Sequence, residues 1–128
     1  MQSHSALFGT VPSALPALWN EQGQVRAGEV AKLLSFSQRE FAQAVRLPPK
    51  GFSFKGRLPE EVEQRVREWA TVLEEVARFF EGDLRKTTLW FRIPNPLLGD
   101  LEPRQMIQVG RARKLLQIVR DEIAGQVP

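Results

Sequence analysis

The residue types that carry most enzyme chemistry are scarce in this chain. It contains no cysteine, and its single histidine, His4, lies in an N-terminal stretch without hydrophobic periodicity. Disulfides, thiolate metal sites and cysteine nucleophiles are therefore excluded, and a histidine-based acid–base pair or zinc site is not expected. Most acidic residues alternate with lysine or arginine on predicted helical segments, which is typical of a solvated helix face. We expect a protein that is not an enzyme.

The residues best suited to contact a charged partner form a basic stretch in the first half of the chain. Within it a single acid, Glu40, stands against five basic residues, and the whole chain has a net charge of +3. Such a local excess of positive charge can supply contacts to phosphate groups. A solvated surface that binds nothing explains the charge equally well. The basic residues are Arg39, Arg46, Lys50, Lys55 and Arg57.

A second motif combines residue types that are common at protein interfaces with residues that fix the backbone. Residues 90–99 have the sequence WFRIPNPLLG, and Gly110 follows further along the chain. Trp and Arg are frequent hot spots of interfaces. Prolines restrict the path of the chain, Asn95 can bond to nearby backbone, and Gly99 can adopt a conformation closed to other residues. The residues alone favour a rigid corner between two helices, with a binding surface as the alternative.

Two short helices followed by a basic segment are predicted in the first half of the chain, an order that fits a helix-turn-helix. The helices span about residues 27–34 and 37–46. The third segment, residues 50–57, has the length of a short helix, but Gly51 and Gly56 disfavour a helix by roughly 1 kcal/mol each. In a helix-turn-helix this third element presents donors to the major groove. Because many helical bundles contain such a unit, the pattern alone is weak evidence for DNA binding.

The second of these helices has a well-defined start. Ser37 can act as its N-cap, and Glu40 three residues later completes a capping box. Phe36 and Phe41 are placed to form a hydrophobic staple across this start. The paired prolines at residues 48–49 end the helix, because proline lacks the backbone donor and restricts the residue before it.

A long helix from Glu60 to about Gly82 carries the main apolar seam. Its apolar residues follow a spacing of 4, 3, 4, 3 and 4, which places them on one helix face. With Phe79, this surface is larger than a small domain easily covers, and we therefore expect a homodimer through apolar helix faces. The seam residues are Val62, Val66, Trp69, Leu73, Val76 and Phe80.

Shorter helices are predicted in the remainder of the chain. Asp83 can cap a helix over residues 84–92, and two more follow at about residues 103–110 and 111–124. Gly125 is predicted to end the last one. No strand alternation and no internal repeat is present. The predicted fold class is all-α.

Together, these motifs resemble the antitoxin of RES–Xre toxin–antitoxin modules. The likeness covers about residues 15–125, and the second half resembles the Xre/MbcA/ParS toxin-binding domain. Its most specific part is the PNPLLG corner at residues 94–99, followed by Gly110-Arg111-Ala112. Further matching stretches are Leu15–Trp19, Gly23–Arg26, Val30–Leu34, Ser37–Ala42, Pro103, Met106-Ile107 and the apolar Leu115, Val119 and Ile123.

The resemblance implies a partner and a role. The family's partner is a RES-domain toxin that depletes cellular NAD. The antitoxin dimerises, buries the entrance of the toxin's active site and often represses its own operon through the Xre-like unit. NAD belongs to the toxin, so no cofactor is expected in this chain. Two alternatives remain: a DNA-binding transcriptional repressor without a toxin partner, and a dimerisation module that has lost DNA binding.

The resemblance, the rigid corner and the clusters of basic residues together indicate which residues form the two binding surfaces. The toxin-binding surface is expected at the corner, the start of the last helix and the chain's end. It comprises Trp90, Pro94, Asn95, Pro96, Leu98, Gly99, Gly110, Arg111, Arg113, Lys114 and Gly125. Operator DNA, if bound, is expected to contact Arg39, Lys50, Ser53, Lys55 and Arg57. Toxin binding is the stronger expectation, because the segment after the Leu-Pro turn is shorter than the recognition helix of the family.

The expected architecture is an Xre-like helix-turn-helix unit followed by a long helix and a small helical toxin-binding domain. We expect a flexible segment at residues 1–25, the Xre-like unit at residues 26–67 and the toxin-binding domain at residues 68–128. No apolar run approaches the ~18 residues of a membrane span. The N-terminus lacks the pattern of a secretion signal. We therefore expect a cytoplasmic protein.

The basic stretch leads to a prediction about DNA. Binding of the chain to its own promoter should weaken steeply with salt, because phosphate contacts release counterions. Replacing Lys55 and Arg57 together by alanine should weaken binding further, as measured by titration at two salt concentrations. Unchanged binding by the double variant would place the recognition segment elsewhere, and the absence of salt-sensitive binding would rule out the repressor role.

Overall fold

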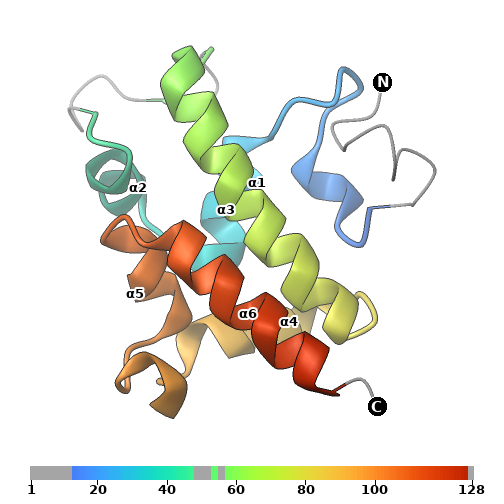
Figure 1. The fold of residues 1–128 in the computed structure, drawn as a ribbon. Coiled ribbons are helices and arrows are strands. Elements are labelled where there is room, and N and C mark those ends of the chain that lie inside the picture. Colours follow the sequence, from blue (N-terminus) through green and yellow to red (C-terminus); the bar gives the residue numbers. More distant parts are fainter. Residues whose placement is uncertain (1–12, 48–52, 55–56, 127–128) are drawn as a thin grey trace.

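The computed structural model describes residues 13–47, 53–54 and 57–126 of the chain, and these residues fold as helices and connecting turns (Figure 1). The only β pairing among them is two isolated bridges, so the predicted all-α class is confirmed. The elements in order are η2 (Pro16–Leu18), α1 (Ala27–Leu34), α2 (Gln38–Ala44), α3 (Glu60–Phe79), α4 (Leu84–Arg92), η3 (Pro96–Leu98), α5 (Pro103–Gln108) and α6 (Ala112–Gln126).

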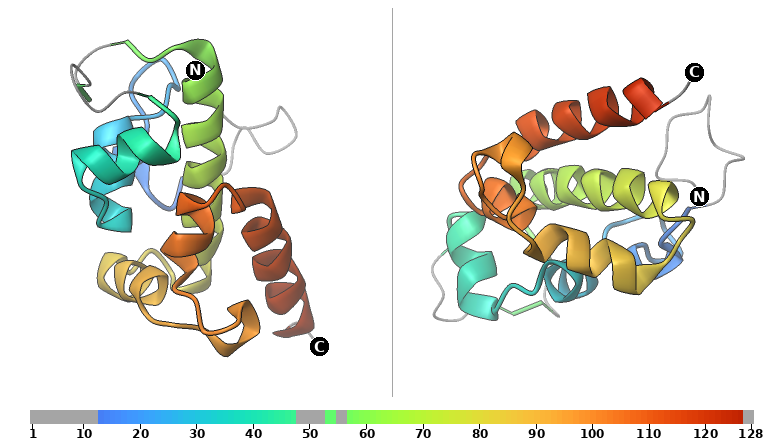
Figure 2. Two further views of the ribbon diagram at one scale, coloured as in Figure 1. Left: turned by 90° about the vertical axis from the view of Figure 1, so that its left-hand side faces the viewer. Right: turned by 90° about the horizontal axis from the view of Figure 1, so that it is seen from below.

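Helix α3 crosses the middle of the molecule and contacts α1, α4 and α6 (Figures 1 and 2). Its predicted seam is confirmed as a buried face, with Val66, Trp69 and Leu73 almost fully enclosed by the chain itself. The uncovered apolar surface from which we expected a homodimer is therefore absent at these residues. Phe79, at the end of α3, is 52% exposed and is the large apolar side chain that this helix leaves uncovered. A homodimer stays a prediction.

The start of α2 forms as the sequence predicts. The Ser37 hydroxyl accepts from the backbone N–H of Glu40 at 3.0 Å, and the Glu40 carboxylate accepts from the Ser37 N–H at 2.8 Å. Phe36 and Phe41 are both buried, and both rings meet the indole of Trp69 edge to face, with centroids 6.0 and 5.4 Å away. These two rings thus connect the start of α2 to the central helix, and the predicted staple between them stays a prediction.

The predicted short third helix falls largely outside the described residues, and Lys50 and Lys55 lie there. Ser53 and Phe54 are described, and neither is helical. The Phe54 ring packs edge to face on Phe41, with centroids 5.0 Å apart. Part of this segment is therefore attached to the core through an aromatic contact.

Helix α6 runs parallel to α3, and ion pairs connect the two helices. Arg113 Nε lies 2.5 Å from Glu68, and Arg120 Nε lies 2.9 Å from Glu75. Both partners advance by two helical turns between the pairs, which fixes the register of the two helices. The prediction that Gly125 ends the last helix is wrong, because α6 continues through Gln126. A glycine costs a helix only about 1 kcal/mol, which α6 tolerates.

The segment before α1, expected to be flexible, is packed from Ser13 onward. Leu15 and Leu18 are buried in the same core cluster as α3. The carboxylate of Glu74, which is itself buried, accepts hydrogen bonds from Ala14 N at 2.9 Å and from the Trp19 indole N–H at 3.0 Å. The Ser13 hydroxyl and Leu15 N–H also donate to it. One core thus includes both halves of the described chain, and the division into three segments stays a prediction.

The structure contains no helix, in the part of the chain that it describes, that is both long and apolar enough to cross a membrane.

The Glu74 contacts generate a stability prediction. Replacing Glu74 by alanine leaves at least three donors without their acceptor in a part-buried site, so the free energy of unfolding should fall by about 3 kcal/mol in urea denaturation. Glu75→Ala is the matched control, because it removes only the partly exposed ion pairs with Arg78 and Arg120 and should cost about 1 kcal/mol or less. Equal losses for the two variants would contradict the role assigned to Glu74.

Candidate functional site

The corner between α4 and α5 is held by the side chain and backbone of Asn95. Its side-chain oxygen accepts from the Leu97 N–H at 2.9 Å, and its backbone carbonyl accepts from Leu98 and Asp100 N–H groups at 2.9 and 3.0 Å. The Asn95 N–H donates to the Leu101 carbonyl at 2.9 Å. Asn95 therefore closes the turn from both ends, as expected from its type and position.

Two consecutive residues at the top of this turn adopt a left-handed backbone. Gly99 and Asp100 each have φ of 64°. Glycine takes this conformation without steric cost, and Asp is among the side chains that tolerate it. The corner is thus fixed by backbone geometry as well as by hydrogen bonds.

The side chains of the corner divide into an anchor and an exposed set. Leu98 is buried, and Trp90 is half-buried, with its ring edge to face against Phe91 at 4.9 Å. Pro94 and Pro96 are exposed. The most exposed apolar side chains are Leu97 at 62% and Ile93 at 49%, with Leu101 beside them in the turn at 39%. We call Ile93, Leu97 and Leu101 the corner surface; the sequence had singled out none of them.

The predicted basic residues at the start of α6 differ in whether they form an ion pair. Gly110 has φ of 87°, which lets the chain reverse so that Arg111 N–H donates to the Met106 carbonyl at 2.8 Å. Arg111 and Lys114 are exposed, and neither forms an ion pair with a described residue. Arg113 is also exposed but is paired with Glu68.

These two groups of predicted toxin-binding residues are not gathered into one cluster. Figure 1 shows the corner at the lower left and the start of α6 above it, with α5 between them. Gly125 lies near the other end of α6. The expected surface is therefore spread over one side of the C-terminal half.

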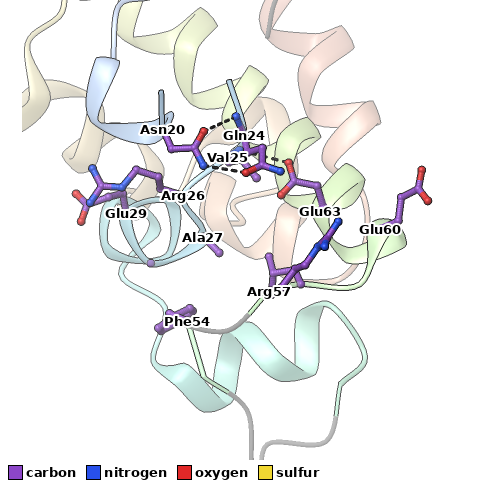
Figure 3. Close-up of a pocket in the computed structure, with 12 residues that line it drawn as sticks. Asn20, Gln24, Val25, Arg26, Ala27, Glu29, Phe54, Arg57, Glu60 and Glu63 are labelled. Carbon is purple, nitrogen blue, oxygen red and sulfur yellow. Dashed lines mark hydrogen bonds between the residues drawn. The ribbon is translucent and has the colours of Figure 1, made fainter. Parts of the chain in front are cut away.

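The predicted DNA-binding residues are described only in part. Arg39, in the first turn of α2, is exposed, and so are Ser53 and Arg57. Lys50 and Lys55 lie outside the described residues. Arg39 and Arg57 come from separate elements, and Arg57 borders an open hollow beside α1 and α3 (Figure 3).

This hollow is partly polar, and some of its polar groups are bonded within the chain. Figure 3 shows the Asn20 and Gln24 side chains bonded to each other and the Val25 N–H donating to Glu63. Three acids and two arginines line it, so it has no clear preference for a cation or an anion. Among the described residues, no group of acidic or histidine side chains is placed to hold a metal ion. We therefore assign no ligand to the hollow.

The sequence analysis missed Glu74 as a structural residue. It shares a helix face with Ala70 and Ala77, four residues before and three after it, and both are fully buried. Two small residues flanking an acid on one face indicate the close approach of another segment. The predicted seam lies on the adjacent face of α3, about 90° around the helix axis.

Comparison with known proteins gives one structural likeness. No family model matches the chain, and no curated protein matches it. A chain in the crystal structure of the M. tuberculosis MbcT–MbcA toxin–antitoxin complex is 23% identical. The match covers 80% of this chain and 94% of that chain, with a TM-score of 0.49. At this TM-score the likeness carries no argument about function.

Proposed function

We propose that the chain is an antitoxin that neutralises a RES-type toxin by direct contact and that it acts by binding rather than by catalysis. The family resemblance of the PNPLLG corner and the Gly110-Arg111-Ala112 sequence suggests the class of the partner. The corner surface supplies the observation that supports binding at the corner.

The supporting observation is that apolar side chains stand exposed on a turn that is already fixed. Leu97 and Ile93 are about half or more exposed, whereas their neighbour Leu98 is buried and holds the turn to the core. Apolar groups presented in this way gain free energy when a partner covers them. Because the backbone is ordered by Asn95, little conformational entropy is lost on docking.

Arg111 and Lys114 extend the proposed surface with charge. Both are exposed and without an acidic partner among the described residues, so they are free to face an anionic site on a toxin. Arg113 would exchange its partner Glu68 for one on the toxin. Since an exposed ion pair contributes little, this exchange costs about 1 kcal/mol or less.

The end of α6 contributes to the proposal as a helix rather than as a flexible tail. Ile123 packs against the core, so removing it together with the chain's end would also disturb the fold. A chain that ends at Ala124 keeps this contact and removes Gly125. That truncation is the proper test of whether the chain's end contacts the toxin.

Operator binding and homodimer formation belong to the proposal as further properties of the antitoxin. The exposure of Arg39 and Arg57 supports contact with DNA phosphates. The exposed Phe79 at the end of α3 supports a contact between copies.

We predict that Ile93→Asp with Leu97→Asp abolishes rescue of cells that express the cognate toxin. Both side chains are exposed, so circular dichroism should show an unchanged helical fold, while buried carboxylates at the interface should weaken binding by at least about 3 kcal/mol. Gln22→Asp with Gln43→Asp is the matched control, because it makes the same change in net charge on two exposed residues that precede α3 and lie outside the proposed toxin-binding residues. It should rescue fully. Full rescue by the folded double variant would remove the corner from the neutralising surface.

A further inference from the structure

A second apolar surface lies in a groove between η2, α1 and α4. The groove has a volume of about 830 Å³. On the α4 side, Leu84 and Leu89 are each 54% exposed, and on the α1 side Leu33 is half-buried. Nothing in the proposed role of the corner explains why these leucines are left uncovered.

The rim of the groove is basic. Lys32 on α1 and Arg85 and Arg92 on α4 are exposed and line it, and Glu29 is the acid among the lining residues. None of the three cations forms an ion pair with a described residue, although five other arginines of the chain do. Arg85, Leu89 and Arg92 are spaced four and three residues apart, so they share one face of α4.

The segments that form the walls of the groove are fixed by contacts with the core. Leu15 and Leu18 are buried and are tied to α3 through the Glu74 carboxylate. Helix α4 is capped by Asp83, whose side chain accepts from the Lys86 N–H at 3.0 Å, and is anchored by the buried Phe91. The nine residues of α4 span about 13 Å. The groove is thus preformed, and its α4 wall is long enough to contact two to three turns of a bound helix.

We propose that this groove binds an acidic, amphipathic helical segment of a partner protein. Apolar residues of the segment would cover Leu84, Leu89 and Leu33, and its carboxylates would face Lys32, Arg85 and Arg92. This is the helix-in-groove mode, in which apolar anchors give affinity and rim charges select the partner. The proposal stands whether or not the corner binds a toxin.

The charges and shape of the groove argue against other occupants. A second copy docked through the same face would bring Arg85 and Arg92 against their own equivalents, which is repulsive. A membrane surface is also a poor match, because Leu33, Leu84 and Leu89 line a concave groove, whereas membrane insertion requires apolar side chains on a protruding surface. Duplex DNA offers phosphates but nothing apolar to cover Leu84 and Leu89.

The test uses the full chain and a designed, fluorescein-labelled peptide of about 15 residues with leucines on one helical face and glutamates elsewhere. Fluorescence anisotropy should show saturable binding, and a scrambled peptide of the same composition should bind at least about tenfold more weakly. Leu89→Glu should weaken binding by a similar factor. The double variant Arg85→Glu with Arg92→Glu should do the same, yet should bind a peptide whose glutamates are replaced by lysines.

The control is Arg46→Glu with Lys86→Glu, which makes the same change in net charge on exposed residues that do not line the groove and should leave peptide binding within about twofold. Binding of the lysine peptide by the α4 double variant shows that this variant is folded and has lost recognition only. Equal binding of the scrambled peptide, no binding at all, or equal weakening by the control variant would overturn the proposal. Tighter binding of anionic phospholipid vesicles or of duplex DNA than of the peptide, lost in the same α4 variants, would also overturn it.

Discussion

Burying the carboxylate of Glu74 in the middle of α3 is possible only because donors from one short segment converge on it. Three backbone or indole N–H groups and a hydroxyl donate to its two oxygens, and Arg78 lies 3.6 Å away. An ionised group without such partners would cost several kcal/mol. The same hydrogen bonds hold Leu15 and Leu18 against the core. The burial of Glu74 and the apolar packing of this segment therefore depend on each other.

This constraint shapes both binding surfaces that we propose. With η2 seated on α3, the groove beside α4 has a fixed wall, and α4 itself packs against α1, α3 and α5. The corner then begins where α4 ends, and Asn95 fixes its path. Arg92 lines the groove and the next residue, Ile93, belongs to the corner surface, so the end of α4 connects the two proposed surfaces.

The helices were predictable because local rules and tertiary packing agree there. The capping box at Ser37 and Glu40 uses neighbours in the sequence, and the Asp83 cap sets the start of α4 in the same way. The corner was predictable as a rigid turn from Asn95, its flanking prolines and Gly99. What the sequence did not predict depends on contacts between distant segments. The seam of α3 is covered by other helices of the same chain, and Glu74 bonds to residues about 60 positions away. Ile93, Leu97 and Leu98 are all apolar, and only the folded turn determines that the first two are exposed and the third is buried.

The central claim is that the corner surface, ordered before binding, is what a toxin covers. Amide hydrogen exchange on the full chain, alone and with its cognate toxin, tests it most directly. The account predicts that Leu97, Leu98 and Asp100 amides are already slowed in the free chain, because Leu97 N–H bonds to the Asn95 side chain and the other two to its carbonyl. It further predicts stronger protection of residues 93–101 in the complex, with α2 unchanged. A complex in which protection at residues 93–101 stays as in the free chain would contradict the account.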